Sequence, residues 1–274
     1  MQKLLLIITI AGIIYSSSFK KITWVAIGDS ITYLNEHTDE TGNRVTKGYM
    51  TMVTEKLSTV KYINQGHNGW TSGNIAEKID DLNIIKADVY SIFLGTNDWW
   101  QGRPIGSLED YKNNTGNATL MGSYRIIINK LRSVNKEAKI ICVTPMQRVD
   151  FVYINDMKNI AWGCYKDKNG QQLAQFAEAI VAVAAYENFS VVDLYKKSGM
   201  THENLVKFKR LKNPQTGIYK NYTYPSFIDV PFNPETDEYP YPAEAADMTY
   251  DGLHPSDKGY AVIANMLLKI IEKY

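Results

Sequence analysis

The chain has 274 residues and an almost balanced charge, with 30 Lys and Arg against 29 Asp and Glu. A nucleic-acid-binding protein usually shows a basic excess or a basic stripe, and this sequence has neither, so we expect no nucleic-acid partner. Cys142 and Cys164 are the only cysteines, and no His/Cys cluster has the spacing of a zinc site. We expect no metal site, and a disulfide between the two cysteines stays open.

Residues 1–18 have the pattern of a secretory signal peptide, in which a positive start precedes a short apolar run and small residues. Lys3 is followed by an apolar run over residues 4–15 and by serines at 16–18. The run has 12 residues, whereas a membrane span needs about 20, so we expect no stable membrane anchor. The sequence predicts a secreted or periplasmic protein with one mature domain over residues 19–274.

The mature part of the chain alternates apolar runs with helical patterns. Strands are expected over residues 22–27, 60–64, 88–94, 139–143 and 190–194. Helices are expected over residues 48–57, 72–82, 120–134, 171–186 and 258–273. Short, nearly continuous apolar strands separated by helices are typical of a parallel sheet buried on both faces. The sequence therefore predicts an α/β fold, a three-layer α/β/α sandwich with a central parallel sheet of about five strands.

Three of the predicted strands end in short runs of Gly, Asn, Asp or Ser. These runs are Gly28-Asp29-Ser30, Asn-Gln-Gly-His-Asn-Gly at 64–69, and Gly-Thr-Asn-Asp at 95–98. Each run alone is also typical of a turn or a helix cap. In open parallel sheets, however, ligands bind beyond the carboxyl ends of the strands. Together the three runs predict a single site at this edge of the sheet.

Asp251 and His254 lie three residues apart, just before the last predicted helix. At this spacing the carboxylate can reach the imidazole, fix its tautomer and stabilise its charged form. A serine hydroxyl is a weak nucleophile until a base such as histidine takes its proton. Ser30 and His254 are therefore a candidate nucleophile and base. A lone histidine more often has a structural role, and this role or a substrate contact is assigned to His37, His67 and His202.

Four sequence words occur in a fixed order along the chain: AIGDS at 26–30, NQGHNG at 64–69, LGTND at 94–98 and DGLHP at 251–255. In wording and order they resemble the SGNH hydrolases, also called the GDSL esterases and lipases. The resemblance runs over nearly the whole mature chain and implies a flavodoxin-like sheet and hydrolysis of a carboxylic ester. The elbow G-x-S-x-G of the α/β-hydrolases is absent, which disfavours that other fold.

The resemblance implies a role for each of five residues. Ser30 matches the nucleophile of the family, His254 its base, and Asp251 the partner that orients the base. The backbone N–H groups of Ser30 and Gly69 and the side-chain amide of Asn97 match the three oxyanion donors. Such preorganised donors matter because losing one typically costs about 10²- to 10³-fold in kcat.

The residues that would line the substrate pocket are less well defined. Trp70-Thr71 stands where many family members have Asp-Thr, which leaves the Gly69 donor intact but puts the local pocket in doubt. Two adjacent tryptophans cannot both face one core, so we expect Trp99 or Trp100 to line the pocket. Packing beneath residues 101–118 is the alternative. The candidate pocket residues are Trp99, Trp100, Trp70 and Asp29.

Residues 206–250 lack clear periodicity and are rich in Tyr and Pro. Long segments of this kind in a compact domain are usually functional or disordered, and the aromatic content favours order here. Because the segment directly precedes Asp251, we expect it to lie near the site. Its tyrosine rings suit sugar faces or acyl chains, and a structural lid that only packs on the domain is the equal alternative.

The sequence thus predicts a serine ester hydrolase that forms an acyl-enzyme on Ser30 and needs no metal or cofactor. The first substrate hypothesis is a small-molecule or glycan ester, with removal of short acyl groups such as acetyl from carbohydrate. The alternatives are a lipase, lysophospholipase or thioesterase acting on longer chains, and a sugar O-acyltransferase. A catalytically idle glycan-binding protein is a further alternative, and the sequence does not indicate the oligomeric state.

Overall fold

The computed structural model describes residues 21–274 of the chain. The predicted leader over residues 1–18 lies outside the described residues. Within residues 21–274, no helix combines the length and the apolar character needed to cross a membrane.

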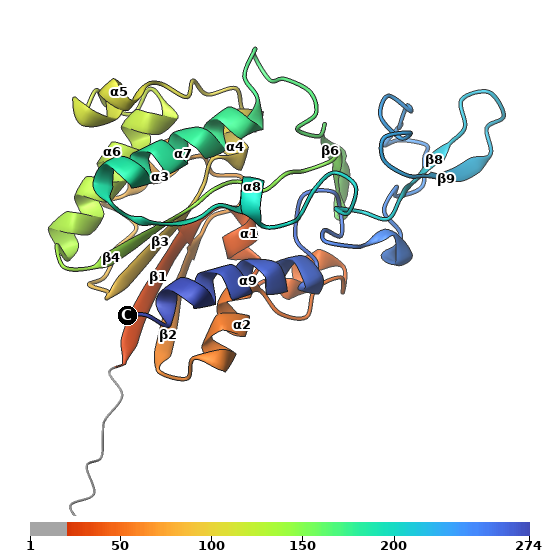
Figure 1. The fold of residues 1–274 in the computed structure, drawn as a ribbon. Coiled ribbons are helices and arrows are strands. Elements are labelled where there is room, and N and C mark those ends of the chain that lie inside the picture. The colour runs from red at the N-terminus through yellow and green to blue at the C-terminus, as the bar shows by residue number, and fades with distance from the viewer. Residues whose placement is uncertain (1–20) are drawn as a thin grey trace, which may run out of the picture.

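A five-stranded parallel sheet forms the centre of the molecule, in the order β2-β1-β3-β4-β7. Its strands are β1 (Ile22–Gly28), β2 (Val60–Gly66), β3 (Val89–Phe93), β4 (Lys139–Val143) and β7 (Ser190–Val192). All five were expected from the sequence, so the predicted parallel sheet is confirmed. Helices cover both faces of this sheet (Figure 1), which gives the predicted three-layer α/β/α sandwich.

The helices lie between and after the strands. The apolar periodicity predicted the five over residues 49–56, 72–78, 120–134, 173–187 and 257–271, and it did not predict the shorter ones. They are α1 (Ser30–Tyr33), η1 (Thr38–Thr41), α2 (Tyr49–Lys56), α3 (Ser72–Lys78), α4 (Thr96–Trp100), α5 (Leu108–Lys112), α6 (Leu120–Val134), α7 (Leu173–Glu187), α8 (Leu194–Lys197), η2 (Ala243–Ala245) and α9 (Asp257–Ile271). Thr71, Thr119 and Ser256 cap α3, α6 and α9 through side-chain oxygens that accept backbone N–H groups, which satisfies donors that a helix start leaves free.

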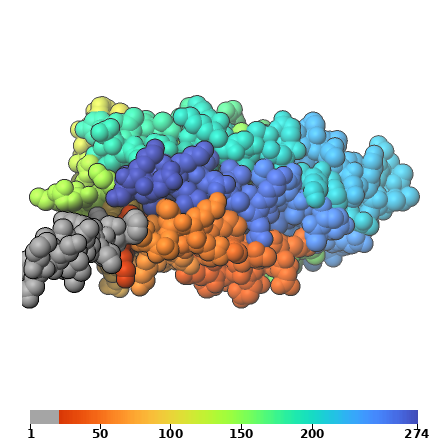
Figure 2. Space-filling view, turned by 60° about the horizontal axis from the view of Figure 1, so that its bottom comes forward, coloured from red at the N-terminus to blue at the C-terminus, as the bar shows by residue number. Residues whose placement is uncertain are grey.

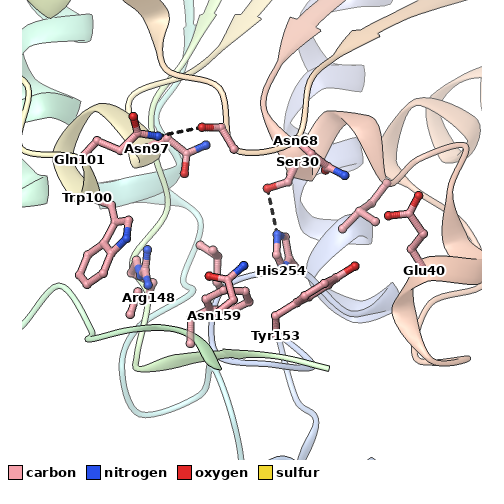
Figure 3. A pocket seen from close by; sticks show the side chains of 15 residues that line it. Ser30, Glu40, Asn68, Asn97, Trp100, Gln101, Arg148, Tyr153, Asn159 and His254 are labelled. Carbon is pink, nitrogen blue, oxygen red and sulfur yellow. Dashed lines mark hydrogen bonds between the residues drawn. The ribbon is translucent and has the colours of Figure 1, made fainter. Parts of the chain in front are cut away.

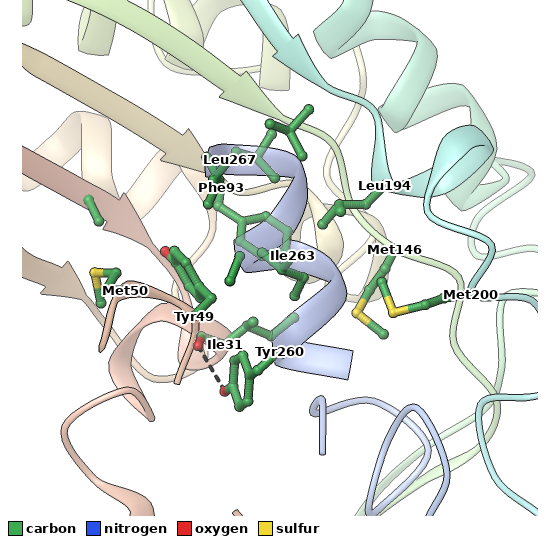
Figure 4. Packing of buried hydrophobic residues seen from close by; sticks show 14 of the residues in the cluster. Ile31, Tyr49, Met50, Phe93, Met146, Leu194, Met200, Tyr260, Ile263 and Leu267 are labelled. Carbon is green, nitrogen blue, oxygen red and sulfur yellow. Dashed lines mark hydrogen bonds between the residues drawn. The ribbon is translucent and has the colours of Figure 1, made fainter. Parts of the chain in front are cut away.

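Alternate residues of β1 pack into two separate hydrophobic cores, one on each face of the sheet. Trp24 and Ala26 belong to a core shared with α2 and α9, whereas Val25 and Ile27 belong to one shared with α3, α6 and α7. Figure 4 shows part of the first core, with α9 packed across the sheet. Side chains of a strand point alternately to opposite faces, so a continuous apolar strand is what a sheet covered on both faces requires.

The strand order reverses at β1, which has β2 on one side and β3 on the other. Ligands of doubly wound sheets bind in the crevice that opens beyond the strands at such a point. The segments that follow β1, β2 and β3 therefore meet at one edge, and they carry the three polar runs noted above.

Two segments outside the sheet depart from simple alternation. The Tyr-rich segment 206–250 is ordered, with a two-stranded hairpin of β8 (Lys209–Lys212) and β9 (Tyr219–Tyr222). Figures 1 and 2 both show it at one end of the molecule. A second hairpin, β5 (Phe151–Tyr153) and β6 (Asp156–Ala161), was not predicted from the sequence. Both cysteines, Cys142 and Cys164, are buried free thiols, so they form no disulfide.

Candidate active site

Ser30 stands at the first position of α1, directly after β1. Asp29 caps this helix, because its carboxylate accepts the backbone N–H of Ile31 at 3.0 Å. The chain leaves the strand at Gly28, where a Cβ would overlap the side chain of Thr32. A tight strand-to-helix turn thus places the Ser30 side chain at the open edge of the sheet, where it is partly exposed.

Two buried contacts hold the turn that carries Ser30. The hydroxyl of Tyr260 in α9 donates to the carbonyl of Ile31 at 3.0 Å (Figure 4). The hydroxyls of Thr32 and Tyr49 are 2.9 Å apart. These bonds connect α1 to α2 and α9, so the nucleophile candidate lies on a rigid support rather than a loose loop.

Ser30, His254 and Asp251 form a hydrogen-bonded chain. His254 Nε2 lies 2.9 Å from Ser30 Oγ (Figure 3). His254 Nδ1 lies 2.7 Å from Asp251 Oδ2. The second carboxylate oxygen of Asp251 accepts the backbone N–H groups of Leu253 and His254 at 3.0 and 2.7 Å. The carboxylate is fully buried, and hydrogen bonds fix both of its oxygens. It can therefore hold the His254 imidazole in one tautomer.

Aromatic rings fix the plane of the His254 imidazole. Tyr250 stacks on it with a centroid distance of 5.9 Å, and Phe151 meets it edge-on at 5.3 Å. The loop between Asp251 and His254 turns at Gly252, which has a φ of 90° and approaches the carbonyl of Asp150 too closely for any Cβ. Only glycine fits this backbone conformation without strain.

Gly69 and Asn97 line the same pocket as Ser30 and His254. Gly69 has a φ of 72°, and its carbonyl accepts from the side chain of Gln101 at 2.9 Å (Figure 3). Asn97 donates one amide hydrogen to the carbonyl of Trp70 at 3.0 Å. This bond orients the Asn97 amide, and it leaves the second amide hydrogen for an oxyanion.

A buried carboxylate fixes these two segments to each other. Asp98 in α4 accepts the backbone N–H and the hydroxyl of Ser72 at 2.8 and 2.6 Å, and Arg103 lies 3.2 Å from it. Burial raises the pKa of Asp98, although the Ser72 hydrogen bonds and Arg103 counteract this. Asp98 therefore connects the start of α3, which follows Gly69, to α4, which carries Asn97.

The pocket in front of Ser30 has a volume of about 450 Å³. Its lining combines the residues named above with side chains from η1, the β5–β6 hairpin and the segment before it. These residues are Ser30, Leu34, Glu40, Asn68, Gly69, Asn97, Trp100, Gln101, Arg148, Phe151, Tyr153, Asn159, Ala161, Leu253 and His254. The lining mixes polar side chains such as Gln101 and Asn159 with apolar ones such as Phe151, so the pocket can contact both polar and apolar parts of a substrate.

Of the four candidate pocket residues, the structure places one in the pocket lining and three outside it. Trp100 lines the pocket, as one of the two adjacent tryptophans was expected to do. Trp99 does not, because it is fully buried in the second core and its indole N–H donates to the carbonyl of Gln171. Trp70 stacks on His67 beside the pocket without lining it. Asp29 is buried beneath Ser30 as a helix cap, so it is a support and not a pocket residue.

The Tyr-rich segment contributes structure to the site and no pocket lining. Tyr241 donates to the carbonyl of Asp150, and Tyr239 donates to that of Val152 at 3.0 Å. Both acceptors belong to the chain beside Phe151, which covers His254. Of the two alternatives for residues 206–250, the structure favours a segment that packs on the domain and supports the pocket wall.

Four residues of the pocket lining were not predicted from the sequence. Glu40, Arg148, Tyr153 and Asn159 line the pocket but belong to no recognisable sequence word. The β5–β6 hairpin carries two of them, and its register is irregular at Val152 and Tyr153. Alternation of buried and exposed residues is too short there to signal a strand.

Two buried ionisable groups near Ser30 have shifted pKa values. Burial raises the pKa of Asp29 to about 6, although the Ile31 backbone hydrogen bond and His254 counteract this. Burial also lowers the pKa of Arg148 to about 10, against the attraction of nearby acidic groups such as Asp251. Within residues 21–274, no cluster of three or more His, Cys, Asp and Glu side chains could hold a metal ion.

The parallel sheet and the polar residues at its carboxyl edge define a hydrolase of the flavodoxin-like type that acts on esters. Comparison with protein families agrees. The chain belongs to the GDSL-like lipase/acylhydrolase family, whose model matches residues 26–211. This match includes Ser30, Gly69 and Asn97 and ends before Asp251 and His254.

Solved structures show the same relationship. A possible lipase from Chitinophaga pinensis is 63% identical, with a TM-score of 0.91, and the match covers 92% of this chain and 98% of that one. A lipase/acylhydrolase from Enterococcus faecalis is 18% identical, with a TM-score of 0.51 and coverage of 92% and 96%. The acetylxylan esterase Axe2 from Geobacillus stearothermophilus is 16% identical, with a TM-score of 0.52 and coverage of 91% and 94%. These last two likenesses show the fold alone. No curated protein matches the chain in sequence.

Proposed function

We propose that the protein is a serine esterase that forms an acyl-enzyme on Ser30. The observation that supports this most strongly is the hydrogen-bonded chain from Ser30 through His254 to Asp251, which opens into the pocket. A base within 2.9 Å of the hydroxyl is within the reach that proton transfer needs. Gly69 and Asn97, which line the same pocket, complete the arrangement as oxyanion donors.

The reaction follows from these positions. His254 Nε2 takes the proton from Ser30 Oγ as that oxygen attacks the ester carbonyl carbon, and Asp251 stabilises the imidazolium that forms. The carbonyl oxygen becomes an oxyanion, which the N–H donors bind. The C–O bond to the alcohol then breaks, and His254 returns the proton to the leaving oxygen. Water repeats these steps on the acyl-enzyme and releases the acid.

Hydrolysis of nitrophenyl acetate by the purified protein tests this mechanism. We expect Ser30→Ala to lower kcat by about 10⁴- to 10⁶-fold. Ser226→Ala, at an exposed serine in the Tyr-rich segment, is the matched control and should retain the parent rate. A fluorophosphonate should label the parent on the peptide that contains Ser30. An S30A variant as active as the parent would refute the mechanism.

For the substrate, we propose short acyl groups such as acetyl on carbohydrate. The partly exposed Trp100 and the neighbouring Gln101 amide support this, because an aromatic ring beside a polar group suits a sugar. The Chitinophaga pinensis relative is described as a possible lipase, which favours longer chains as the second candidate. Acetyl, butyryl and octanoyl nitrophenyl esters decide between them: a preference for octanoyl would contradict the short-acyl proposal.

We also propose that the enzyme is secreted. The support is the signal-peptide pattern over residues 1–18. Expression of the full chain with determination of the mature N-terminus tests it. We expect a new terminus near Phe19 in the secreted fraction, and an uncleaved cell-associated protein would argue against secretion.

A further inference from the structure

Arg148 is an unusual component of the pocket wall. It follows β4, lines the pocket and is only 1% exposed. Its guanidinium lies over the rings of Trp99 and Trp100, at 5.6 and 5.5 Å from their centroids. Figure 3 shows it beside Trp100, at the end of the pocket away from Glu40. The proposed reaction gives this side chain no role.

Two nitrogen atoms of this guanidinium, Nε and Nη2, are buried and have no hydrogen-bond partner within residues 21–274. The two carboxylates that attract Arg148 electrostatically, Asp150 and Asp251, are engaged elsewhere. Asp150 pairs with Lys209 at 2.8 Å, and Asp251 pairs with His254. Burying a charge without a partner costs free energy, so proteins rarely retain such a charge unless a ligand supplies the missing hydrogen bonds and counter-charge.

Charge around the pocket is unevenly distributed. Lys168 adds a second cation near Arg148, because its Nζ lies 4.2 Å from the ring centroid of Trp100 and 4.4 Å from that of Trp162. Glu40 lies at the opposite end, where the hydroxyl of Tyr33 donates to it at 2.8 Å. In Figure 3, Ser30 and His254 lie between the cationic end and the acidic end.

We propose that the ester substrate carries a carboxylate, which binds Arg148 at the Trp100 end of the pocket. This inference rests on the proposed esterase function and narrows its substrate class. A guanidinium presents paired N–H donors that match the two oxygens of a carboxylate, whereas a neutral hydroxyl engages them less strongly. Lys168 attracts the anion to the same end, and Glu40 repels it from the other.

The carboxylate has two possible positions in the substrate, and each is tested by one pair of esters. For the acyl side, nitrophenyl succinate is compared with the neutral nitrophenyl ester of succinamic acid. For the alcohol side, an acetylated methyl glucuronoside is compared with its neutral uronamide. We expect the parent to prefer the carboxylate in one pair by about 10- to 100-fold in kcat/KM, the range of a charge-assisted hydrogen bond.

Arg148→Met tests the residue itself. We expect the carboxylate preference to disappear in R148M, whereas Arg210→Met, at an arginine of β8 outside the pocket, should retain it. A parent enzyme with no preference in either pair overturns the proposal, and so does an R148M variant that retains the preference. If R148M fails to fold, the parent measurement still decides.

Direct binding separates this inference from the esterase proposal. The S30A variant should bind glucuronate more tightly than glucuronamide in calorimetry, and R148M should lose the difference. If nitrophenyl acetate is not cleaved but this difference is present, the esterase proposal fails and the carboxylate site stands. Equal binding of the two sugars by S30A, together with equal hydrolysis rates, overturns the carboxylate site and leaves the esterase proposal intact.

Discussion

The two sides of the pocket are built in different ways. On one side, Ser30, Gly69 and Asn97 follow three neighbouring parallel strands, so the sheet itself brings them together. On the other side, residues 148–161 form a wall without a strand of the main sheet beneath it. Contacts with the Tyr-rich segment 206–250 hold this wall in place.

We infer that one side of the pocket serves the reaction and that the other side contacts the rest of the substrate. The strand-end side carries the nucleophile and the oxyanion donors of the proposed reaction, and the loop before α9 adds Asp251 and His254 to them. The wall carries Arg148, Tyr153 and Asn159, which can contact the parts of a substrate beyond the ester bond. Catalytic residues held on a rigid sheet with variable surrounding segments allow one chemistry to serve many substrates.

The largest expected effect comes from Asp251→Asn on the catalytic side. The carboxylate of Asp251 accepts hydrogen bonds from His254 Nδ1 and from two backbone N–H groups. An amide has only one acceptor oxygen, so the D251N variant would no longer hold the imidazole in the tautomer that carries a proton on Nδ1. We expect kcat for nitrophenyl acetate to fall by about 10⁴-fold. Asp156→Asn on the exposed hairpin is the control and should keep the parent rate. A D251N variant within tenfold of the parent (roughly 1.4 kcal/mol) would exclude this role for Asp251.

The next effect belongs to the wall and concerns stability. Lys209 in β8 is 4% exposed and pairs with Asp150 at 2.8 Å. Lys209→Met removes the cation beside that carboxylate and leaves it only the hydrogen bonds from Tyr165 and Gly163. This should lower the free energy of unfolding by about 3 kcal/mol. Urea denaturation measures it, and Lys220→Met on the exposed part of β9 is the matched control. We expect kcat for nitrophenyl acetate to change little in K209M. Unchanged stability would mean that the pair does not hold the wall.

Asn97→Ala tests the strand-end side with a smaller effect. Removing the side-chain donor should lower kcat by about 10²- to 10³-fold, because the oxyanion exists only in the transition state. Asn159→Ala removes an amide from the wall and should change KM rather than kcat. Steady-state kinetics with nitrophenyl acetate compare the two variants. If N97A changed only KM, Asn97 would contact the substrate without stabilising the oxyanion.

The sequence predicted the five strands and the strand-end residues well, because both depend on local patterns. Apolar runs specify buried parallel strands, and the residues directly after them reach the edge by geometry. Asp251 and His254 also lie within one turn of each other. Within the chain of hydrogen bonds from Ser30 to Asp251, the 2.9 Å contact between His254 and Ser30 joins distant parts of the sequence. The family resemblance supplied that link.

The pocket wall could not be predicted because its contacts join segments far apart in sequence. The hydroxyl of Tyr241, on a loop, donates to the carbonyl of Asp150, and no periodicity in the sequence indicates such a hydrogen bond. Trp99 was a candidate for the pocket because it adjoins Trp100. Its burial depends on the position of Gln171, which precedes α7 and accepts its indole N–H. A single sequence without tertiary contacts does not distinguish the two tryptophans.

The smallest expected effect concerns Asp29, the buried cap beneath Ser30, and appears as a pH dependence of stability. Burial raises its pKa from 3.8 to about 6, so the folded protein holds this proton more tightly than the unfolded chain. The stability that comes from the protonated carboxyl is therefore fully present below pH 3.8, and it is lost as the pH rises through about 6.

Asp29→Asn removes this titration and retains an oxygen that can accept the Ile31 backbone N–H. We expect D29N to gain stability relative to the parent as the pH rises from 4 to 7, approaching about 3 kcal/mol, the equivalent of the pKa change. Urea denaturation at several pH values in this range measures the difference. Asp156→Asn serves as the exposed control and should show no such trend. If the parent and D29N curves run parallel, the carboxylate beneath Ser30 is ionised without cost, and His254 then faces a second full negative charge besides Asp251.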